Sequence, residues 1–270
     1  EYGDDDGDAN FVKAFKVNTS DNSVLTGDQD GLMFADTVQE RYALTYDSTI
    51  NRVVVFSYQQ PSSTDTIYGN ILDYDSSSTN GLTLELEKSL PGTACFVNAY
   101  NGGQSGGSNG SWAAYNPTAN IHHVLIKDIS DSDDKIRNVK ISGSDGSFTI
   151  DPHTTYELTI PDDMDTYTTI WWNNARGMLG VAGASAQSTS GAELRGLGYT
   201  FTEDTGTEAN STFTANGTAV VFHSTYYGRY LNFDNDTTSD MHTGNFAAIL
   251  EFYGGSGSNR GIIVGFDTGG

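Results

Sequence analysis

Short runs of hydrophobic residues, separated by stretches rich in Gly, Asn, Asp, Ser and Thr, recur along the whole chain. No long stretch has the three-and-four spacing of an amphipathic helix, so the pattern predicts an all-β protein with many short strands. The predicted strands are 11–17, 42–46, 52–58, 67–73, 82–87, 94–99, 112–115, 121–127, 136–141, 147–150, 167–172, 178–182, 194–201, 219–223, 229–233, 245–252 and 261–266.

Some of these strands form a weak internal repeat, in which a strand ending in an aromatic residue, a polar turn and a strongly apolar strand follow one another. Each copy predicts a hairpin, because Asn, Asp and Gly in the turns tolerate left-handed backbone angles. The paired segments are 42–46 with 52–56, 112–115 with 121–126, 169–172 with 178–181, 219–222 with 229–233, and 248–252 with 262–264.

A four-stranded antiparallel unit repeated every ~40–60 residues is typical of a β-propeller blade. The sequence therefore predicts one β-propeller domain over residues 1–270, with five blades. Four blades are the alternative, since the step from Phe222 to Phe252 is too short for a whole blade. Strands near the two ends, 11–17 and 262–266, are expected to complete one blade together and close the ring.

Two segments of the repeat also carry a resemblance. Tyr42-Ala-Leu-Thr-Tyr-Asp-Ser-Thr-Ile-Asn-Arg-Val-Val-Val, followed by Tyr68-Gly-Asn-Ile, resembles a propeller-type repeat of marine bacteriophage structural and tail-associated proteins. Trp112-Ala-Ala-Tyr-Asn-Pro-Thr-Ala-Asn is similar to the same unit. The likeness covers mainly residues 40–75 and 110–150. It implies a virion or surface protein without catalytic activity.

The charge balance restricts the partners. The chain has 13 basic and 35 acidic residues, a net charge of −22, which repels nucleic acids and anionic membrane surfaces. No run approaches the ~20 apolar residues of a membrane-spanning helix, so we expect no membrane insertion. Cys95 is the only cysteine, which excludes an internal disulfide, and its apolar surroundings indicate a core position.

Acidic loops are the candidate metal sites. Asp4, Asp6 and Asp8 alternate around a Gly-containing turn, and carboxylate oxygens that converge in this way bind calcium. Calcium is thus the one candidate ion, and no other cofactor is expected. The alternative for these loops is a solvated surface of an acidic protein.

Aromatic pairs are the candidate contacts for glycans. Trp171-Trp172 and Tyr226-Tyr227 are adjacent pairs, and neighbours in a strand face opposite sides. Trp171, Tyr226 and Tyr227 are therefore candidates for stacking on sugar rings, with packing between blades as the alternative.

The sequence also contains Asn-x-Ser/Thr sequons, which are candidate glycosylation sites in a secreted protein. The asparagines are Asn18, Asn109, Asn210, Asn216 and Asn235.

Catalytic signatures are weak. Gly103-Gln-Ser-Gly-Gly107 matches a nucleophile-elbow pattern but lies in a Gly/Ser loop with no helix after it. His122 and His123 are adjacent in a strand and cannot share a metal. Isolated carboxylates on apolar strands, which a glycosidase would need, are Glu85, Glu157, Glu193 and Glu251.

Together these features predict a non-catalytic structural and adhesive protein of a virion appendage or extracellular assembly. Its expected partners are copies of itself and surface glycans, and its expected location is extracellular or on a virion surface. Two alternatives stay open. One is a subunit of a secreted cellular filament, and the other is a glycan-cleaving hydrolase on a propeller fold.

Overall fold

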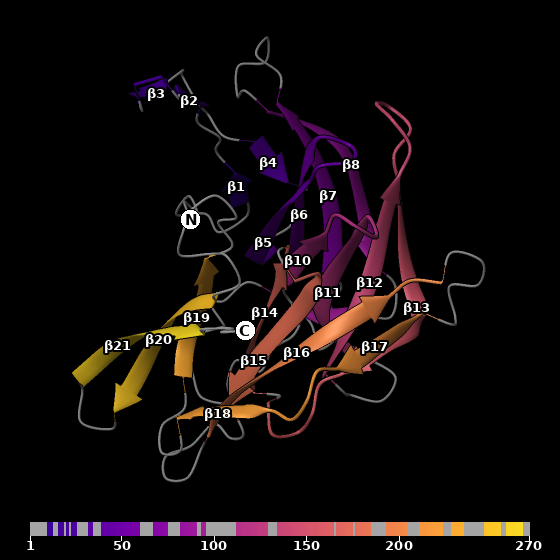
Figure 1. Cartoon of the computed structure of the whole chain (residues 1–270). Coiled ribbons are helices and arrows are strands. Elements are labelled where there is room, and N and C mark those ends of the chain that lie inside the picture. Colours follow the sequence, from indigo (N-terminus) through magenta and orange to yellow (C-terminus); the bar gives the residue numbers. More distant parts are fainter. Residues whose placement is uncertain are drawn as a thin grey trace. The chain divides into compact units, whose positions relative to one another are not determined.

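A computed structural model gives the structure of this protein, and every regular element in its described part is a β-strand (Figure 1). No helix in the described part of the chain is long and apolar enough to cross a membrane. The described residues are 10–12, 16–18, 20–21, 23–25, 32–34, 39–59, 67–74, 82–90, 93–95, 112–128, 134–164, 166–174, 176–184, 193–204, 211–223, 228–234, 246–254 and 258–266.

The chain divides into two compact units, of which the first comprises residues 1–94 and 141–150. In this unit β1 pairs with β4, β2 pairs with β3, and β5 to β8 form one antiparallel sheet in sequence order. The strands are β1 (Asn10–Val12), β2 (Lys16–Asn18), β3 (Ser23–Leu25), β4 (Leu32–Phe34), β5 (Gln39–Asp47), β6 (Arg52–Gln59), β7 (Ile67–Tyr74) and β8 (Leu82–Leu90).

The second unit comprises residues 95–140 and 151–270. Its sheets have the orders β10-β11-β12-β13, β14-β15-β16-β17 and β19-β20-β21, with β9 also paired to β11 and β18 to β16. The strands, of which β9, β12 and β13 also include residues of the first unit, are β9 (Thr93–Cys95), β10 (Ala113–Asn116), β11 (Ile121–Asp128), β12 (Asp134–Ser142), β13 (Thr149–Thr159), β14 (Thr166–Asn173), β15 (Met178–Ala184), β16 (Leu194–Thr202), β17 (Thr212–Ala215), β18 (Val220–His223), β19 (Gly228–Asp234), β20 (Phe246–Gly254) and β21 (Ser258–Phe266).

The second strand is buried on both faces in the sheets that begin with β5, β10 and β14, and in the last of these residues 179–183 of β15 are all buried. Residues 54–57 of β6 and 121–126 of β11 are all buried, so their apolar runs do not alternate with exposed positions. By contrast, β5 is an edge strand in which Ala43 and Thr45 are buried while Leu44 and Tyr46 are exposed. Strands buried on both faces need cover on both sides, and the continuous apolar run 53–56 of β6 is typical of such a strand.

Three hairpins share one turn geometry. In β5–β6, β10–β11 and β14–β15 the last paired residues are Asp47 with Arg52, Asn116 with Ile121, and Asn173 with Met178. The Oδ1 atoms of Asp47, Asn116 and Asn173 accept hydrogen bonds from backbone N–H groups two or three residues later. These are Asx turns, in which the side-chain oxygen accepts hydrogen bonds from backbone N–H groups in place of a backbone carbonyl and so folds the chain locally.

The last turn position of each hairpin has a left-handed backbone. Asn51, Asn120 and Gly177 have φ values of 55°, 54° and 61°. Asparagine tolerates this conformation better than most residues, so the first two turns do not require glycine. Two tyrosines reinforce them, since the Tyr46 and Tyr115 hydroxyls donate to the Oδ1 atoms of Asn51 and Asn120.

The fourth predicted hairpin is wrong. Its first segment is β18, which pairs with β16, while its second segment is β19, which pairs with β20. The fifth predicted pair does form a hairpin, β20–β21, with Leu250 opposite Ile262. The expected shared terminal blade is not among the described sheets, because β1 pairs with β4 and β21 is paired only with β20. β18 therefore pairs with the earlier strand β16 and not with β19, the next strand along the chain.

Strand β13 is longer than its sequence predicts. The prediction ended at residue 150, before Pro152, but the strand continues to Thr159. Proline lacks a backbone N–H and is tolerated where one side of the strand needs no partner. β13 is the last strand of its sheet, so this condition is met.

Arg52 holds a charged cluster in the first unit. Its Nε donates to Glu85 Oε2 at 2.6 Å, and its Nη2 lies 2.6 Å from Asp145 Oδ1 and 3.3 Å from Asp73 Oδ2. The guanidinium carbon is 5.7 Å from the ring centre of Phe148. Only 8% of the Arg52 side chain is exposed. The cluster thus ties the start of β6 to β7, to β8 and to the segment 141–150.

We expect Arg52→Met to lower the free energy of unfolding by roughly 2 kcal/mol, because Glu85 would stay largely buried without its countercharge. Urea denaturation of the full chain measures this loss. Arg195→Met is the matched control, since Arg195 likewise pairs with more than one carboxylate, Glu193 and Asp163, but at a more exposed site. An equal or larger loss in the control would contradict the interpretation.

Candidate binding pocket

The predicted site residues fall unevenly on the described chain. The candidate calcium ligands Asp4, Asp6 and Asp8 lie outside the described residues, as do Tyr226 and Tyr227. Among the sequons, Asn109, Asn210 and Asn235 also lie outside, while Asn18 ends β2 and Asn216 follows β17. Trp171 lies in β14. The described residues contain no group of three or more His, Cys, Asp or Glu that could hold a metal ion.

The two adjacent tryptophans lie on opposite faces of β14, as alternation requires, but neither is open to solvent. Trp172 is 3% exposed, and its ring lies 5.5 Å from the ring of His123. Trp171 is 9% exposed and borders a pocket on the other face. Packing therefore accounts for Trp172, whereas Trp171 forms the wall of a pocket.

Glycines make room for the Trp171 indole. Trp171 is paired across the sheet with Gly180, which is paired in turn with Gly198. A Cβ atom on Gly180 would overlap atoms Cε2 and Cζ2 of the indole. Cross-strand aromatic rings commonly cover glycines in this way, because the ring supplies the contacts that the missing side chain cannot.

An interruption of the edge strand opens the pocket. β17 and β18 both pair with β16, and residues 216–219 between them lie opposite only Leu197 and Gly198. The turn leaves the sheet after Asn216, whose N–H donates to the Gly198 carbonyl at 2.9 Å. Gly217 has a φ of 93°, a left-handed angle that favours glycine. These four residues face only two residues of β16, so they interrupt the strand pairing beside Gly198.

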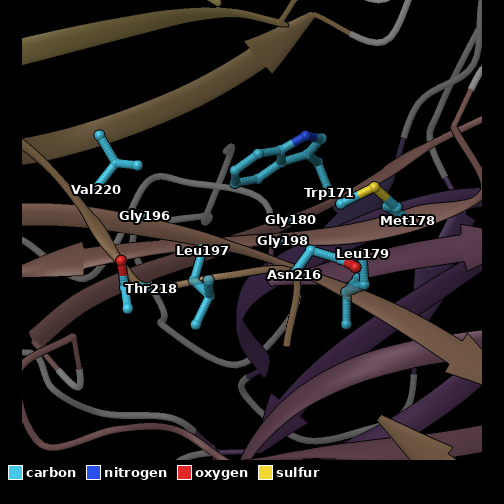
Figure 2. A pocket seen from close by; sticks show the side chains of 10 residues that line it. All are labelled: Trp171, Met178, Leu179, Gly180, Gly196, Leu197, Gly198, Asn216, Thr218 and Val220. Atoms are coloured by element: carbon cyan, nitrogen blue, oxygen red, sulfur yellow. The ribbon is translucent and has the colours of Figure 1, made fainter. Parts of the chain in front are cut away.

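The resulting pocket has a volume of about 150 Å³ (Figure 2). Its floor is the backbone of β15 and β16 at Gly180, Gly196 and Gly198, of which Gly180 lies under the Trp171 indole. Figure 2 shows the Trp171 indole beside Met178 on one side of this floor and Val220 on another. A cavity of ~150 Å³ holds a molecule about the size of benzene, so a single ring fits.

The chemistry of the lining is neutral. Asn216 and Thr218 supply its polar side chains, and no charged side chain is among the lining residues. Asn216 is oriented by Thr200, because its Nδ2 donates to Thr200 Oγ1 at 3.0 Å. An apolar indole with an amide and a hydroxyl at the rim suits an uncharged ligand that has both apolar and hydroxyl-bearing surfaces.

The adjacent histidines have different neighbours. The His122 ring contacts Tyr115, while His123 contacts Trp172, Phe201 and Phe213 with ring centres 5.1–5.5 Å apart. Both side chains are fully buried. The two imidazoles thus serve separate packing environments, as the prediction from alternation required.

His123 is a neutral imidazole. Its Nδ1 lies 2.6 Å from Asn138 Oδ1, and Asn138 Nδ2 donates to the Tyr156 carbonyl. We therefore assign the proton of His123 to Nδ1. Nε2 is buried with no hydrogen-bond partner among the described residues. Burial lowers the pKa of His123 from 6.5 to about 3, against the smaller opposing effect of the Asn138 hydrogen bond.

Three of the four isolated carboxylates that a glycosidase would need form ion pairs with arginines. Glu85 pairs with Arg52, Glu157 with Arg137, and Glu193 with Arg195. The side chain of Glu251 and the Gly103–Gly107 segment lie outside the described residues. In the described part of the chain these three carboxylates are therefore partners in structural ion pairs.

Sequence reasoning identified Trp171 but missed the rest of the pocket. The sequence signal for the rest of the pocket was Arg195-Gly-Leu-Gly-Tyr199, in which glycines at alternate positions leave one face of a strand without side chains. The chain matches no protein-family model, no curated protein and no solved structure.

Proposed function

We propose that this chain is a non-catalytic structural and adhesive module of an extracellular assembly or virion appendage, and that its Trp171 pocket binds a neutral carbohydrate. The pocket is the observation that carries the proposal. An apolar indole face, a flat glycine floor and a polar rim match the two kinds of surface on a sugar ring.

Charge supports a neutral ligand rather than an anionic one. No lining residue of the pocket is charged, and the chain as a whole carries a net charge of −22. An anion would approach against that field and find no cation to pair with in the pocket. A neutral sugar meets no such electrostatic barrier.

The architecture that we propose is a small β-propeller. Sheets β5–β8, β10–β13 and β14–β17 are consecutive meanders of neighbouring strands, as in blades, without the crossover connections of Greek-key sandwiches. The shared Asx turn at the first hairpin of each sheet supports a repeated unit. With β19–β21 as a further sheet, four blades fit the described strands better than five.

Binding of neutral saccharides by the full chain tests the proposal. Glucose and N-acetylglucosamine are titrated while calorimetry and tryptophan fluorescence are recorded. We expect weak binding, since a single ring fills the pocket. Gly198→Ala should weaken this binding at least tenfold, because the new methyl group enters the floor of the pocket. Its Cβ would meet only the flexible Met178 Cε, at 2.5 Å, so the fold should tolerate it.

Thr212→Ala is the matched control for this experiment, because Thr212 is exposed on β17 and does not line the pocket. Its affinity should equal that of the original chain. Absence of binding to every neutral saccharide tested, or unchanged affinity in Gly198→Ala, would overturn the proposed function.

A further inference from the structure

The strand β18 is an exposed edge of its sheet. It pairs with β16 on one side and with no other described strand. Val220 and Val221 are 54% and 43% exposed. Neighbouring residues in a strand point to opposite faces, so β18 presents apolar side chains on both of its faces. The backbone N–H and C=O groups on its free side form a row that another strand can pair with.

This edge lacks the charged residues and prolines that commonly protect an exposed edge. Exposed edges normally carry charged residues, prolines or bulges that block a further strand. Residues 209–228 contain no Asp, Glu, Lys, Arg or Pro, although the chain has 48 charged residues, 13 basic and 35 acidic. One irregularity lies within β18, where the register with β16 shifts at Phe222, while Val220 and Val221 stay in regular pairing with Gly196 and Arg195.

We infer that β18 is a self-association site, at which a second copy of this chain adds its own β18 as an antiparallel strand. Two copies that each carry a net charge of −22 repel one another wherever acidic surfaces approach. The uncharged segment 209–228 is a place where close approach avoids like-charge contacts. Antiparallel pairing of two identical strands is also self-complementary, as a twofold interface requires.

The expected contact is small. β18 has four residues, and β17 continues the same edge beyond the bulge. Specific stable complexes bury ~1,200–2,000 Å² in total, which four paired residues do not reach. A single contact is therefore weak, and many copies held in one assembly would strengthen it through avidity. This inference rests on the assembly role in the proposed function and is independent of the sugar pocket.

Sedimentation equilibrium of the full chain tests the inference. We expect the average mass to rise with protein concentration, and to rise further at high salt because screening weakens the repulsion between copies. Val221→Lys should raise the dissociation constant at least tenfold, since it places a charge at the pairing edge. Val221 does not line the pocket, so sugar binding should stay unchanged.

Leu44→Lys is the matched control. Leu44 is 58% exposed on the edge strand β5, and the substitution makes the same change in net charge. Both variants carry one positive charge more than the original chain, so a general weakening of repulsion would favour association in both. Thermal melting verifies that each variant is folded.

Two results would overturn the inference. One is a monomer mass at every concentration and salt level. The other is a failure of Val221→Lys to raise the dissociation constant more than Leu44→Lys does. If the original chain binds sugar but does not associate, only this inference fails; if it associates but binds no sugar, only the proposed pocket function fails.

Discussion

Gly180→Ala should lower the free energy of unfolding by about 3 kcal/mol, a large cost for one added methyl group. The new Cβ would occupy the space of the Trp171 indole, whose atoms it would overlap. Relief requires the ring to leave a site where it is 9% exposed, or the strands β14 and β15 to separate. Urea denaturation compared with the original chain measures the loss.

Gly198→Ala provides an internal control, because Gly198 is the direct cross-strand partner of Gly180. Its Cβ would meet only the end of the Met178 side chain, and alanine is favoured over glycine in a strand by roughly 0.5–1 kcal/mol where space allows. Its stability should therefore stay near that of the original chain. If both substitutions change the free energy of unfolding equally, the position of the Trp171 indole does not require a residue without a side chain at Gly180.

Acidification should destabilise the fold through His123. The folded state keeps the pKa of this imidazole at about 3, whereas an unfolded chain binds the proton near 6.5. Between these values the unfolded state holds more protons, so stability is complete above about pH 6.5 and falls as the pH decreases. The loss between about pH 7 and pH 5 is about 2 kcal/mol from this residue alone.

Comparison with His123→Asn isolates that contribution. The asparagine amide retains a donor toward Asn138 Oδ1 but does not titrate, although the smaller side chain lowers stability at every pH. Urea denaturation at several pH values gives the slope for each protein. The slope in this window should be flatter in the variant. Parallel slopes would show that His123 is not the group that binds the proton.

Local features of the fold were predictable from the sequence because local chemistry determines them. The absence of helical spacing predicted an all-β chain, and the runs 52–58 and 121–127 predicted strands at β6 and β11. Asp47 and Asn116, each followed by an asparagine four residues later, were expected to form turns that tolerate left-handed angles. Asn51 and Asn120 adopt those angles. A turn needs only its own residues and their hydrogen bonds, so its sequence is sufficient.

The pairing of distant segments was decided only by the tertiary structure. The sequence 219–223 reads as the first strand of a hairpin, yet β18 pairs backward with β16. The pocket depends on that choice, because it forms where β17 and β18 leave a gap along β16 beside Gly198. Strand propensity describes how a segment fits a sheet, but the partner and register follow from burial and contacts between distant residues. The sequence therefore indicated Trp171 as a candidate, while the register of three strands made it a pocket wall.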